Sequence, residues 1–329
     1  MKPFFSIIIP SRNSKKTIKN SIDSLKKLNY PKNNFEIIIV DSSEDNTKKI
    51  LERNKGKNFR IFNNLIKDRR NSNISRNMGA KKARYENLIF LDADCIVSRN
   101  WLNDYAKYVN NDVVGGTVVV GGRNLYSRYF NFGLHRVRLS PKSEKIITVD
   151  NFHESELPRG ANFLIKKTVL RKVNYFDENT PSFDEIELLF RVVNKNYKII
   201  IIPEARVVTE VDNRFGYVIK LSFRQGKGLG YFIMKHFNSK SVEYRLLKFF
   251  AADFLTLFYF YFFQRFVPTF ILFGLEFIFI YLYYQFFIHR NGPFEILAFI
   301  FLDIISLGLV YQFSALSYIL KSIFNSIFK

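Results

Sequence analysis

Two carboxylates directly follow an apolar run in the first third of the chain. Residues 88–95 read Leu-Ile-Phe-Leu-Asp-Ala-Asp-Cys, so Asp92 and Asp94 come just after the run. Four consecutive apolar residues are typical of a strand buried on both faces of a sheet. Ligands of open α/β sheets bind beyond the carboxyl ends of such strands, and paired carboxylates there suit a hard cation that carries phosphate oxygens. The pattern favours a metal–nucleotide site, although a solvated Asp-x-Asp turn would have the same sequence.

The charge of the chain is strongly basic and unevenly distributed. The 329 residues include 50 Lys and Arg against 29 Asp and Glu, a formal net charge of +21. From Leu246 onward, five basic residues are nearly balanced by four acidic ones, so the excess lies before that point. We expect this part to attract polyanions such as nucleotides, phospholipid headgroups or nucleic acid. The single cysteine, Cys95, excludes an intramolecular disulfide and a cysteine-rich zinc site.

The hydrophobic pattern alternates between short strands and helices over the first 95 residues. Strands are expected at 5–9, 35–40, 59–62 and 88–91, and helices at 15–28, 44–53 and 74–83. Further strands are expected at 113–120, 161–165 and 198–202, with a helix at 184–196. Alternating units of this length predict an α/β domain with a doubly wound, mostly parallel sheet.

The composition changes near residue 240, where we place the boundary between domains at 1–240 and 241–329. Three largely apolar segments follow, at 246–263, 266–288 and 296–320. About 20 apolar residues span a hydrocarbon core about 30 Å thick, so two or three transmembrane helices are expected. The first segment either spans the bilayer or lies in the interface.

Charged residues around these segments predict how the chain is oriented. Basic residues crowd the approach to the first segment: Lys220, Arg224, Lys227, Lys235, Lys240, Arg245 and Lys248. The positive-inside rule then places the N-terminal domain in the cytoplasm of a multi-pass membrane protein. Asp253, Glu276 and Asp303 within the segments would face the helix bundle or a partner subunit, which allows a homo-oligomer, or lie at headgroup depth.

Six short motifs, in order, resemble those of the family 2 glycosyltransferases. They are Ser-Ile-Ile-Ile-Pro-Ser-Arg-Asn at 6–13, Ile-Ile-Val-Asp-Ser-Ser-Glu-Asp-Asn-Thr at 38–47, Ser-Arg-Asn-Met-Gly at 75–79, Asp-Ala-Asp at 92–94, Pro-Arg-Gly-Ala-Asn at 158–162 and Phe-Asp-Glu-Ile-Glu-Leu-Leu-Phe-Arg at 183–191. Each motif is weak alone, but their order and spacing over residues 4–230 make the resemblance specific. The resemblance implies a GT-A fold and transfer of a sugar from a nucleotide-sugar donor.

The resemblance assigns donor-side roles to several residues. Pro10, Arg12 and Asn13 would belong to the nucleotide loop. Asp41 would accept hydrogen bonds from the base or ribose, although an Asp there also suits a helix N-cap. Arg76 would reach phosphate or base oxygens, or would be a solvated helix residue. Two further basic residues, Arg224 and Lys227, would neutralise donor or acceptor phosphate, or attract lipid headgroups instead.

The metal and catalytic positions follow from the same resemblance. Asp92 and Asp94 would hold Mg²⁺ or Mn²⁺ on the donor diphosphate. Counting back from Arg191 places the catalytic base at Glu185, where the family has Asp, so either Asp184 or Glu185 can be the base. One alternative is an acidic helix N-terminus favoured by the helix dipole. If the acceptor is itself a lipid phosphate, proton removal is unnecessary and Glu185 would have a lesser role.

The remaining family positions concern the acceptor and a third metal ligand. Gly160, Asn162 and Arg191 fall at acceptor-side positions of the family motifs. Thr209 stands where the family often has a metal-binding His, so the metal would have fewer protein ligands or be held loosely.

These expectations combine into a membrane-anchored, inverting, metal-dependent hexosyltransferase of glycan biosynthesis. Its donor would be a UDP- or GDP-sugar, and its acceptor a polyprenyl or dolichyl phosphate, a lipid-linked oligosaccharide or a glycolipid. A processive polysaccharide synthase is one alternative, but the apolar region is small for a translocation channel. A non-enzymatic, basic, membrane-tethered anion-binding protein is another. No nucleic-acid partner is expected, because no nucleic-acid motif is present and acidic clusters interrupt the basic domain.

Overall fold

The computed structural model describes residues 1–64, 72–122, 124–127, 143–152, 160–209, 214–239, 242–243 and 312–327. They fall into two compact units, Met1–Asp212 and Asn213–Lys329, and each is described by itself. The division between them comes earlier in the chain than the boundary that the composition predicts at residue 240.

The first half of the first unit is a run of parallel strands joined by helices. In chain order the elements are β1 (Phe5–Ser11), α1 (Ile18–Lys26), the short 3₁₀ helix η1 (Lys32–Asn34), β2 (Phe35–Asp41), α2 (Thr47–Asn54), β3 (Phe59–Asn63), α3 (Ser72–Lys82) and β4 (Asn87–Leu91). The strands lie in the order β3-β2-β1-β4, and every neighbouring pair is parallel. The alternating strands and helices expected for this half are confirmed.

The second half departs from the predicted topology. It contains β5 (Cys95–Val97), α4 (Trp101–Ala106), β6 (Val113–Val120), β7 (Lys145–Ile147), β8 (Asn162–Lys166), α6 (Lys167–Lys172), α7 (Asp184–Val193) and β9 (Ile199–Thr209). The sheet continues from β4 as β8-β6-β9-β5, with β7 also paired to β9. Strand β8 runs antiparallel to both β4 and β6, while β6 and β9 are parallel.

The expectation of a mostly parallel sheet is therefore wrong for this half. Of the eight described strand pairings, four are antiparallel, so the sheet is mixed. The physical reason is that β8 inserts between β4 and β6 in the opposite direction. The apolar run of β8 reflects burial on both faces, with Leu164 in one cluster and Phe163 in the other, and an antiparallel strand can be buried in the same way.

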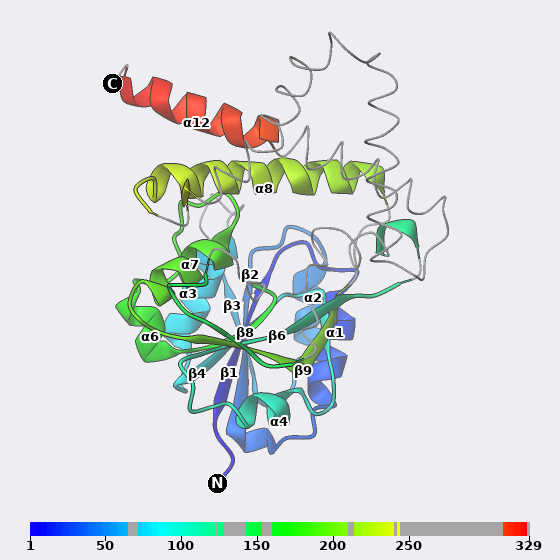
Figure 1. Ribbon diagram of the computed structural model, residues 1–329. Coiled ribbons are helices and arrows are strands. Elements are labelled where there is room, and N and C mark those ends of the chain that lie inside the picture. Colours follow the sequence, from blue (N-terminus) through cyan, green and yellow to red (C-terminus); the bar gives the residue numbers. More distant parts are fainter. Residues whose placement is uncertain are drawn as a thin grey trace. The chain divides into compact units, whose positions relative to one another are not determined.

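Both faces of the sheet are covered, which explains the unbroken apolar runs of the strands. Side chains alternate across a strand, so Ile7 and Ile9 of β1 join one buried cluster and Ile8 joins the other. Residues of α1, α2 and α4 contribute to the first cluster, and residues of α3, α6 and α7 to the second. Figure 1 shows α1 and α2 beside one face and α3, α6 and α7 beside the other.

Helix α3 lies unusually close to β1 because of one glycine. A Cβ atom added to Gly79 would lie 2.5 Å from Cγ2 of Ile8, closer than atoms can pack. The absence of a side chain at Gly79 therefore sets the position of α3 on the sheet. That position matters because α3 also carries Arg76.

The described part of the second unit consists mainly of α8 (Phe215–Lys235) and α12 (Gln312–Ile327). Ser314 Oγ of α12 donates a hydrogen bond of 2.6 Å to the carbonyl oxygen of Phe223. A Cβ added to Gly230 would lie 2.8 Å from the carbonyl oxygen of Ala315, so the two helices meet at small residues.

The predicted membrane segments at 246–263 and 266–288 lie outside the described residues, and 296–320 overlaps them only from 312 onward. Asp253, Glu276 and Asp303 also lie outside them. Among the helices that the structure describes, none combines the length and the apolar character needed to cross a bilayer.

Candidate active site

Residues of the predicted nucleotide loop meet at the carboxyl ends of β1 and β2. Ser11 and Asp41 are register partners at these ends, and Asp41 is buried. Ser43 Oγ donates a hydrogen bond of 2.7 Å to Asp41 Oδ1 and accepts one of 2.7 Å from the backbone N–H of Asn13. Asn13 is held at a positive φ of 50°, and its Oδ1 accepts a hydrogen bond from the backbone N–H of Glu44. The two loops are thus tied together around Asp41.

The other two residues predicted for this loop lie beside it. Pro10 is half-buried in β1, where it pairs with Val40, and Arg12 is exposed. The structure therefore brings Pro10, Arg12, Asn13 and Asp41 to one edge of the sheet. Their contact with a donor stays a prediction.

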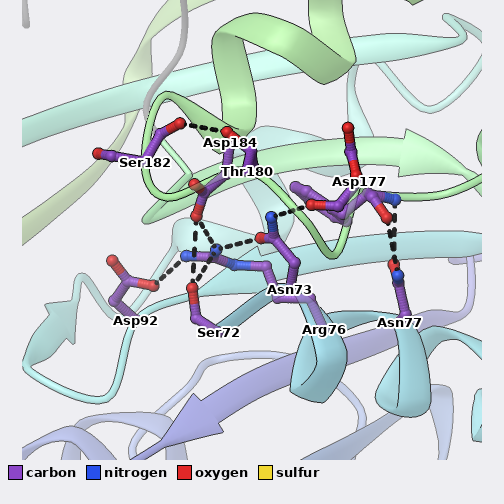
Figure 2. A network of polar contacts seen from close by, with 10 residues as sticks. Ser72, Asn73, Arg76, Asn77, Asp92, Asp177, Thr180, Ser182 and Asp184 are labelled. Carbon is purple, nitrogen blue, oxygen red and sulfur yellow. Dashed lines mark hydrogen bonds and ion pairs between the residues drawn. The ribbon is translucent and has the colours of Figure 1, made fainter. Parts of the chain in front are cut away.

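A second group of polar side chains gathers around Arg76 of α3 (Figure 2). The Arg76 guanidinium is nearly buried, with 7% of the side chain exposed. Its Nη2 lies 3.0 Å from Asp92 Oδ1, and its Nη1 lies 3.0 Å from Asp184 Oδ2. The same Nη1 donates to Ser72 Oγ at 2.7 Å and to Asn73 Oδ1 at 3.1 Å. One guanidinium therefore joins the Asp-x-Asp turn to the start of α7.

The carboxylates around Arg76 stabilise the positive charge of its guanidinium. Burial alone would lower the pKa of Arg76, but the carboxylates of Asp92, Asp184 and Glu185 outweigh it and raise that pKa. Arg76 is thus a fixed cation inside the domain. Its ring neighbour is Phe176, whose centroid lies 5.5 Å from the guanidinium carbon.

Two asparagines of α3 hold the segment that leads into α7. Asn73 Nδ2 donates to the carbonyl oxygen of Asp177 at 2.8 Å, and Asn77 Nδ2 donates to that of Phe176 at 2.9 Å. Asn77 Oδ1 accepts the backbone N–H of Phe176 in return, at 3.0 Å. The segment then reaches α7 through Phe183, whose φ of 67° is left-handed. These contacts fix where Asp184 enters the site.

Sequence reasoning assigned no role to Ser72, Asn73 or Asn77, although Asn77 belongs to the motif at 75–79. Asn73 and Asn77 are spaced by four residues, so they share the helix face that also carries Arg76. That spacing indicates a shared polar helix face. It does not indicate the contact partner, because the loop that Asn73 and Asn77 hold lies about a hundred residues later in the chain.

The second carboxylate of the turn, Asp94, has a distinct environment. Its Oδ1 lies 3.7 Å from the Cys95 Sγ, and it accepts a hydrogen bond from the Thr209 hydroxyl. Burial and the neighbouring Asp92 carboxylate raise the pKa of Asp94 to about 6. Thr209 lies here because it pairs with Cys95 in the β5–β9 ladder. Thr209 therefore lies beside Asp94, and the reduced set of protein ligands expected for the metal stays a prediction.

The donor set at the turn fits a hard divalent cation completed by ligand oxygens. Two carboxylates repel each other here, and a cation would relieve the repulsion that raises the pKa of Asp94. Within the described ranges, no group of three or more His, Cys, Asp or Glu side chains is placed to bind a metal. Asp92 and Asp94 would thus leave most coordination positions of Mg²⁺ to phosphate and water.

The predicted acceptor-side residues occupy different environments. A Cβ added to Gly160 would lie 3.4 Å from Arg76 Nη2 and 3.6 Å from Glu185 Oε2, so Gly160 adjoins the cluster. Pro158 and Arg159 of the same motif lie outside the described residues.

Asn162 lies in the interior of the domain. It has no exposed surface, and its Oδ1 accepts hydrogen bonds from Trp101 Nε1 at 3.0 Å and from the Tyr105 hydroxyl at 2.9 Å. Its Nδ2 donates to the carbonyl oxygens of Thr117 and Ala205. Asn162 thus joins β8, β6, β9 and α4, and its predicted place beside an acceptor stays untested.

Arg191 also makes contacts within the fold. Its guanidinium pairs with buried Glu187, with Nη2 2.7 Å from Oε2, and donates to the carbonyl oxygens of Val173 and Tyr175. These contacts fasten the end of α7 to the turn after α6. Its predicted acceptor role is likewise untested.

The two remaining donor-side candidates, Arg224 and Lys227, belong to α8 in the second unit. Arg224 is exposed, and Lys227 places its ammonium 4.6 Å from the ring centroid of Phe223. Their contact with donor or acceptor phosphate stays a prediction.

A match to a family model identifies the family of the chain. The model described as glycosyl transferase family 2 matches residues 6–173, slightly more than half of the chain. The chain belongs to glycosyl transferase family 2. Five of the six motifs lie within the matched residues, and the resemblance is thereby confirmed at the level of the family.

Sequence relatives of this family 2 member include two named glycosyltransferases. Glycosyltransferase AglE of Haloferax volcanii is 25% identical over 234 residues, covering 69% of this chain and 73% of AglE. The poly(ribitol-phosphate) β-N-acetylglucosaminyltransferase TarP of Staphylococcus aureus is 30% identical over 122 residues, covering 36% of this chain and 37% of TarP.

Solved structures share the fold. The mannosyltransferase PcManGT of Pyrobaculum calidifontis, in complex with GDP-Man and Mn²⁺, aligns with a TM-score of 0.55 at 18% identity, covering 73% of this chain and 65% of PcManGT. Residues 1–349 of S. aureus TarS, in complex with UDP-GlcNAc, align with a TM-score of 0.52 at 20% identity, covering 71% and 72%. The chain spans 44% of a longer TarS chain. At these identities the likeness establishes a GT-A-like fold.

Proposed function

We propose that this family 2 glycosyltransferase transfers a sugar, with inversion, from a UDP- or GDP-linked donor to a lipid-linked acceptor, with Mg²⁺ or Mn²⁺. The observation that carries the proposal is the bridge from Asp92 through Arg76 to Asp184. It brings a candidate metal carboxylate and a candidate base to the two sides of one guanidinium. Structural neighbours with UDP-GlcNAc and with GDP-Man and Mn²⁺ support this donor and metal chemistry.

Each candidate residue would have a separate role in such a transfer. Asp41, at the end of β2, would accept hydrogen bonds from the base or ribose. Asp92 and Asp94 would hold the divalent cation, which when bound stabilises the departing nucleoside diphosphate as a Lewis acid. Asp184 or Glu185 would take the proton of an acceptor hydroxyl. An inverting transfer needs the base and the leaving group on opposite sides of the sugar.

The lipid acceptor and membrane association are supported by the second unit. Lys220, Arg224, Lys227 and Lys235 of α8 recur at spacings that place them on one helix face, and no acidic residue occurs from 215 to 237. Such a face suits anionic headgroups. The apolar composition of 246–320 supports a multi-pass anchor, a cytoplasmic catalytic domain and association between copies through the apolar segments.

An Asp94→Asn variant of the full chain tests the proposal. Nucleoside diphosphate release and sugar transfer would be measured in membranes with added Mn²⁺. We expect transfer to fall by at least about tenfold, because the variant keeps the shape of Asp94 and loses its charge. Asp23→Asn is the control, since Asp23 forms an ion pair with Lys19 on α1. Unchanged transfer by Asp94→Asn would overturn the metal assignment. Mixed products of great length would favour processive synthesis instead.

A further inference from the structure

The two carboxylates of the Asp-x-Asp turn are held by different kinds of contact. Asp92 Oδ1 lies 3.0 Å from Nη2 of the buried Arg76 guanidinium, so a neighbouring charge holds it (Figure 2). Asp94 instead accepts a hydrogen bond from the Thr209 hydroxyl, and its Oδ1 lies 3.7 Å from the Cys95 thiol. Both of these partners of Asp94 are neutral hydrogen-bond donors, and the hydroxyl is the stronger of the two.

Thr209 is fixed in place by the strands on both sides of it. It is the last residue of β9, and it pairs with Cys95 of β5 on one side and with Val120 of β6 on the other. Its carbonyl oxygen accepts a hydrogen bond of 2.7 Å from the backbone N–H of Gly121. The side chain of Thr209 therefore begins at a fixed point beside the turn.

The backbone of the turn is fixed as well. The N–H of Cys95 donates a hydrogen bond of 3.1 Å to the carbonyl oxygen of Asp92, and Cys95 is fully buried at the start of β5. Asp94 directly precedes Cys95, so the β5–β9 ladder holds its backbone on one side. The Asp94 side chain can still change rotamer, and the Thr209 hydroxyl restrains that change from the opposite strand.

We propose that Thr209 is a positioning residue for the divalent cation: its hydroxyl holds the Asp94 carboxylate in the orientation that binds the metal, and it does not coordinate the metal itself. This inference rests on the proposed function and deepens it. Carboxylates that bind metals are commonly hydrogen-bonded themselves, because such contacts orient the ligand. A group on a strand does this more precisely than a group on a loop.

The test measures Mn²⁺ binding to the full chain in detergent, from the electron paramagnetic resonance signal of free Mn²⁺. Saturating UDP and, separately, GDP are present, and each nucleotide without protein is the blank. Thr209→Val keeps the shape of the side chain and removes the hydroxyl, so it should weaken Mn²⁺ binding about 10- to 100-fold. Thr209→Ser keeps the hydroxyl and should stay within about threefold of wild type.

A double-mutant cycle with Asp94→Ala shows whether Thr209 acts through Asp94. Asp92 and the diphosphate remain to hold Mn²⁺ in Asp94→Ala, so its weaker affinity can still be measured. Adding Thr209→Val to that variant should change the affinity by less than about twofold, because the carboxylate that the hydroxyl orients is gone. A Thr209 that coordinated the metal directly would lose affinity by the same factor in both backgrounds.

Thr117→Val is the matched control. Thr117 is a strand threonine of the same sheet, and its hydroxyl donates to the carbonyl oxygen of Ile202 at 3.4 Å. Its Mn²⁺ affinity should stay within about twofold of wild type. Donor turnover gives a second readout: excess Mn²⁺ should restore the rate of Thr209→Val, whose Asp94 keeps its charge, and should not restore that of Asp94→Asn.

Three outcomes would overturn the inference: wild-type Mn²⁺ affinity in Thr209→Val, an equal loss in the wild-type and Asp94→Ala backgrounds, or a Thr209→Ser variant as weak as Thr209→Val. These failures remain distinct from failure of the proposed function. Wild-type protein that binds Mn²⁺ with UDP or GDP satisfies the metal part of the proposed function, whatever the role of Thr209. Wild-type protein that takes up no Mn²⁺ beyond the nucleotide blank overturns both.

Discussion

The guanidinium of Arg76 and the carboxylate of Asp184 form an ion pair across 108 residues of sequence, with Nη1 3.0 Å from Oδ2. Arg76 is placed by α3, which Gly79 lets approach β1, and Asp184 by the loop that Asn73 and Asn77 hold. The pair therefore joins the half of the domain that carries the Asp-x-Asp turn to the half that carries the candidate base. We therefore expect loss of this ion pair to affect both the stability of the fold and the transfer reaction.

Replacing Arg76 by Gln should destabilise the protein. The change leaves Asp184 and Asp92 without their shared cation and removes hydrogen bonds to Ser72 and Asn73. We expect a loss of about 1–3 kcal/mol, or about 2–4 °C in melting temperature for each kcal/mol lost. The control is Lys19→Gln, whose exposed ion pair with Asp23 should contribute less than about 0.5 kcal/mol. Equal melting temperatures for the two variants would show that the Arg76 pairs do not stabilise the fold.

Replacing Asn162 by Leu should be severely destabilising. The variant removes the hydrogen-bond acceptor of Trp101 Nε1 and of the Tyr105 hydroxyl. It also removes the Asn162 donor to the carbonyl oxygens of Thr117 and Ala205. Each buried unsatisfied polar group costs about 1–3 kcal/mol, so the total should exceed about 3 kcal/mol. Thermal melting of the full chain in detergent measures it. A variant with unchanged melting and a raised acceptor KM would instead assign Asn162 to acceptor binding.

Replacing Gly79 by Ala should force α3 away from β1. The new Cβ would lie 2.5 Å from Ile8 Cγ2, and such overpacking typically costs about 1–3 kcal/mol. Gly216→Ala is the matched control, because a Cβ there meets nothing within 4 Å and α8 should tolerate or gain from alanine. Adding Ile8→Ala should recover part of the loss in Gly79→Ala by removing the clashing methyl. Additive effects of the two changes would contradict the close approach.

The pH dependence of stability should report on Asp94. Its folded pKa is raised from 3.8 to about 6, so the neutral carboxyl stabilises the metal-free protein at low pH. That contribution is complete below about pH 4 and is lost as pH rises to about 6, because the unfolded carboxyl ionises first. The melting temperature of wild-type protein relative to Asp94→Asn should therefore fall between pH 4 and 6 and level off above. A melting-temperature difference that stays constant over that range would contradict the raised pKa of Asp94.

The first half of the fold could be predicted because each element there has a local signature. Apolar runs mark β1, β2 and β4, and amphipathic segments separate them. The direction of β8 (Asn162–Lys166) could not be predicted. Its pattern of three apolar residues between two polar ones is the same in either direction, and the strand direction depends on the pairing with β4 and β6. The short elements β5, α4 and α6 were missed because three to six residues show too little periodicity.

The site was predicted residue by residue, but not as a set of contacts. The motifs pointed to Asp92, Arg76 and Asp184 separately, and they assigned Arg76 to the donor. Its pairing with both carboxylates depends on how α3 and α7 pack on the sheet, which no local pattern encodes. Asn162 shows the opposite case, since a polar residue in a family motif proves to be a buried link between strands.

The most direct test of the central claim is nucleotide-dependent melting of the detergent-solubilised full chain. UDP, GDP, CDP and dTDP would each be added with and without Mn²⁺ to wild-type protein and to Asp94→Asn. We predict that UDP or GDP raises the melting temperature of wild-type protein in a Mn²⁺-dependent way, and that Asp94→Asn loses the Mn²⁺-dependent part. The account would be contradicted if none of the four nucleotides shifted the wild-type melting temperature, or if Asp94→Asn responded as wild-type does.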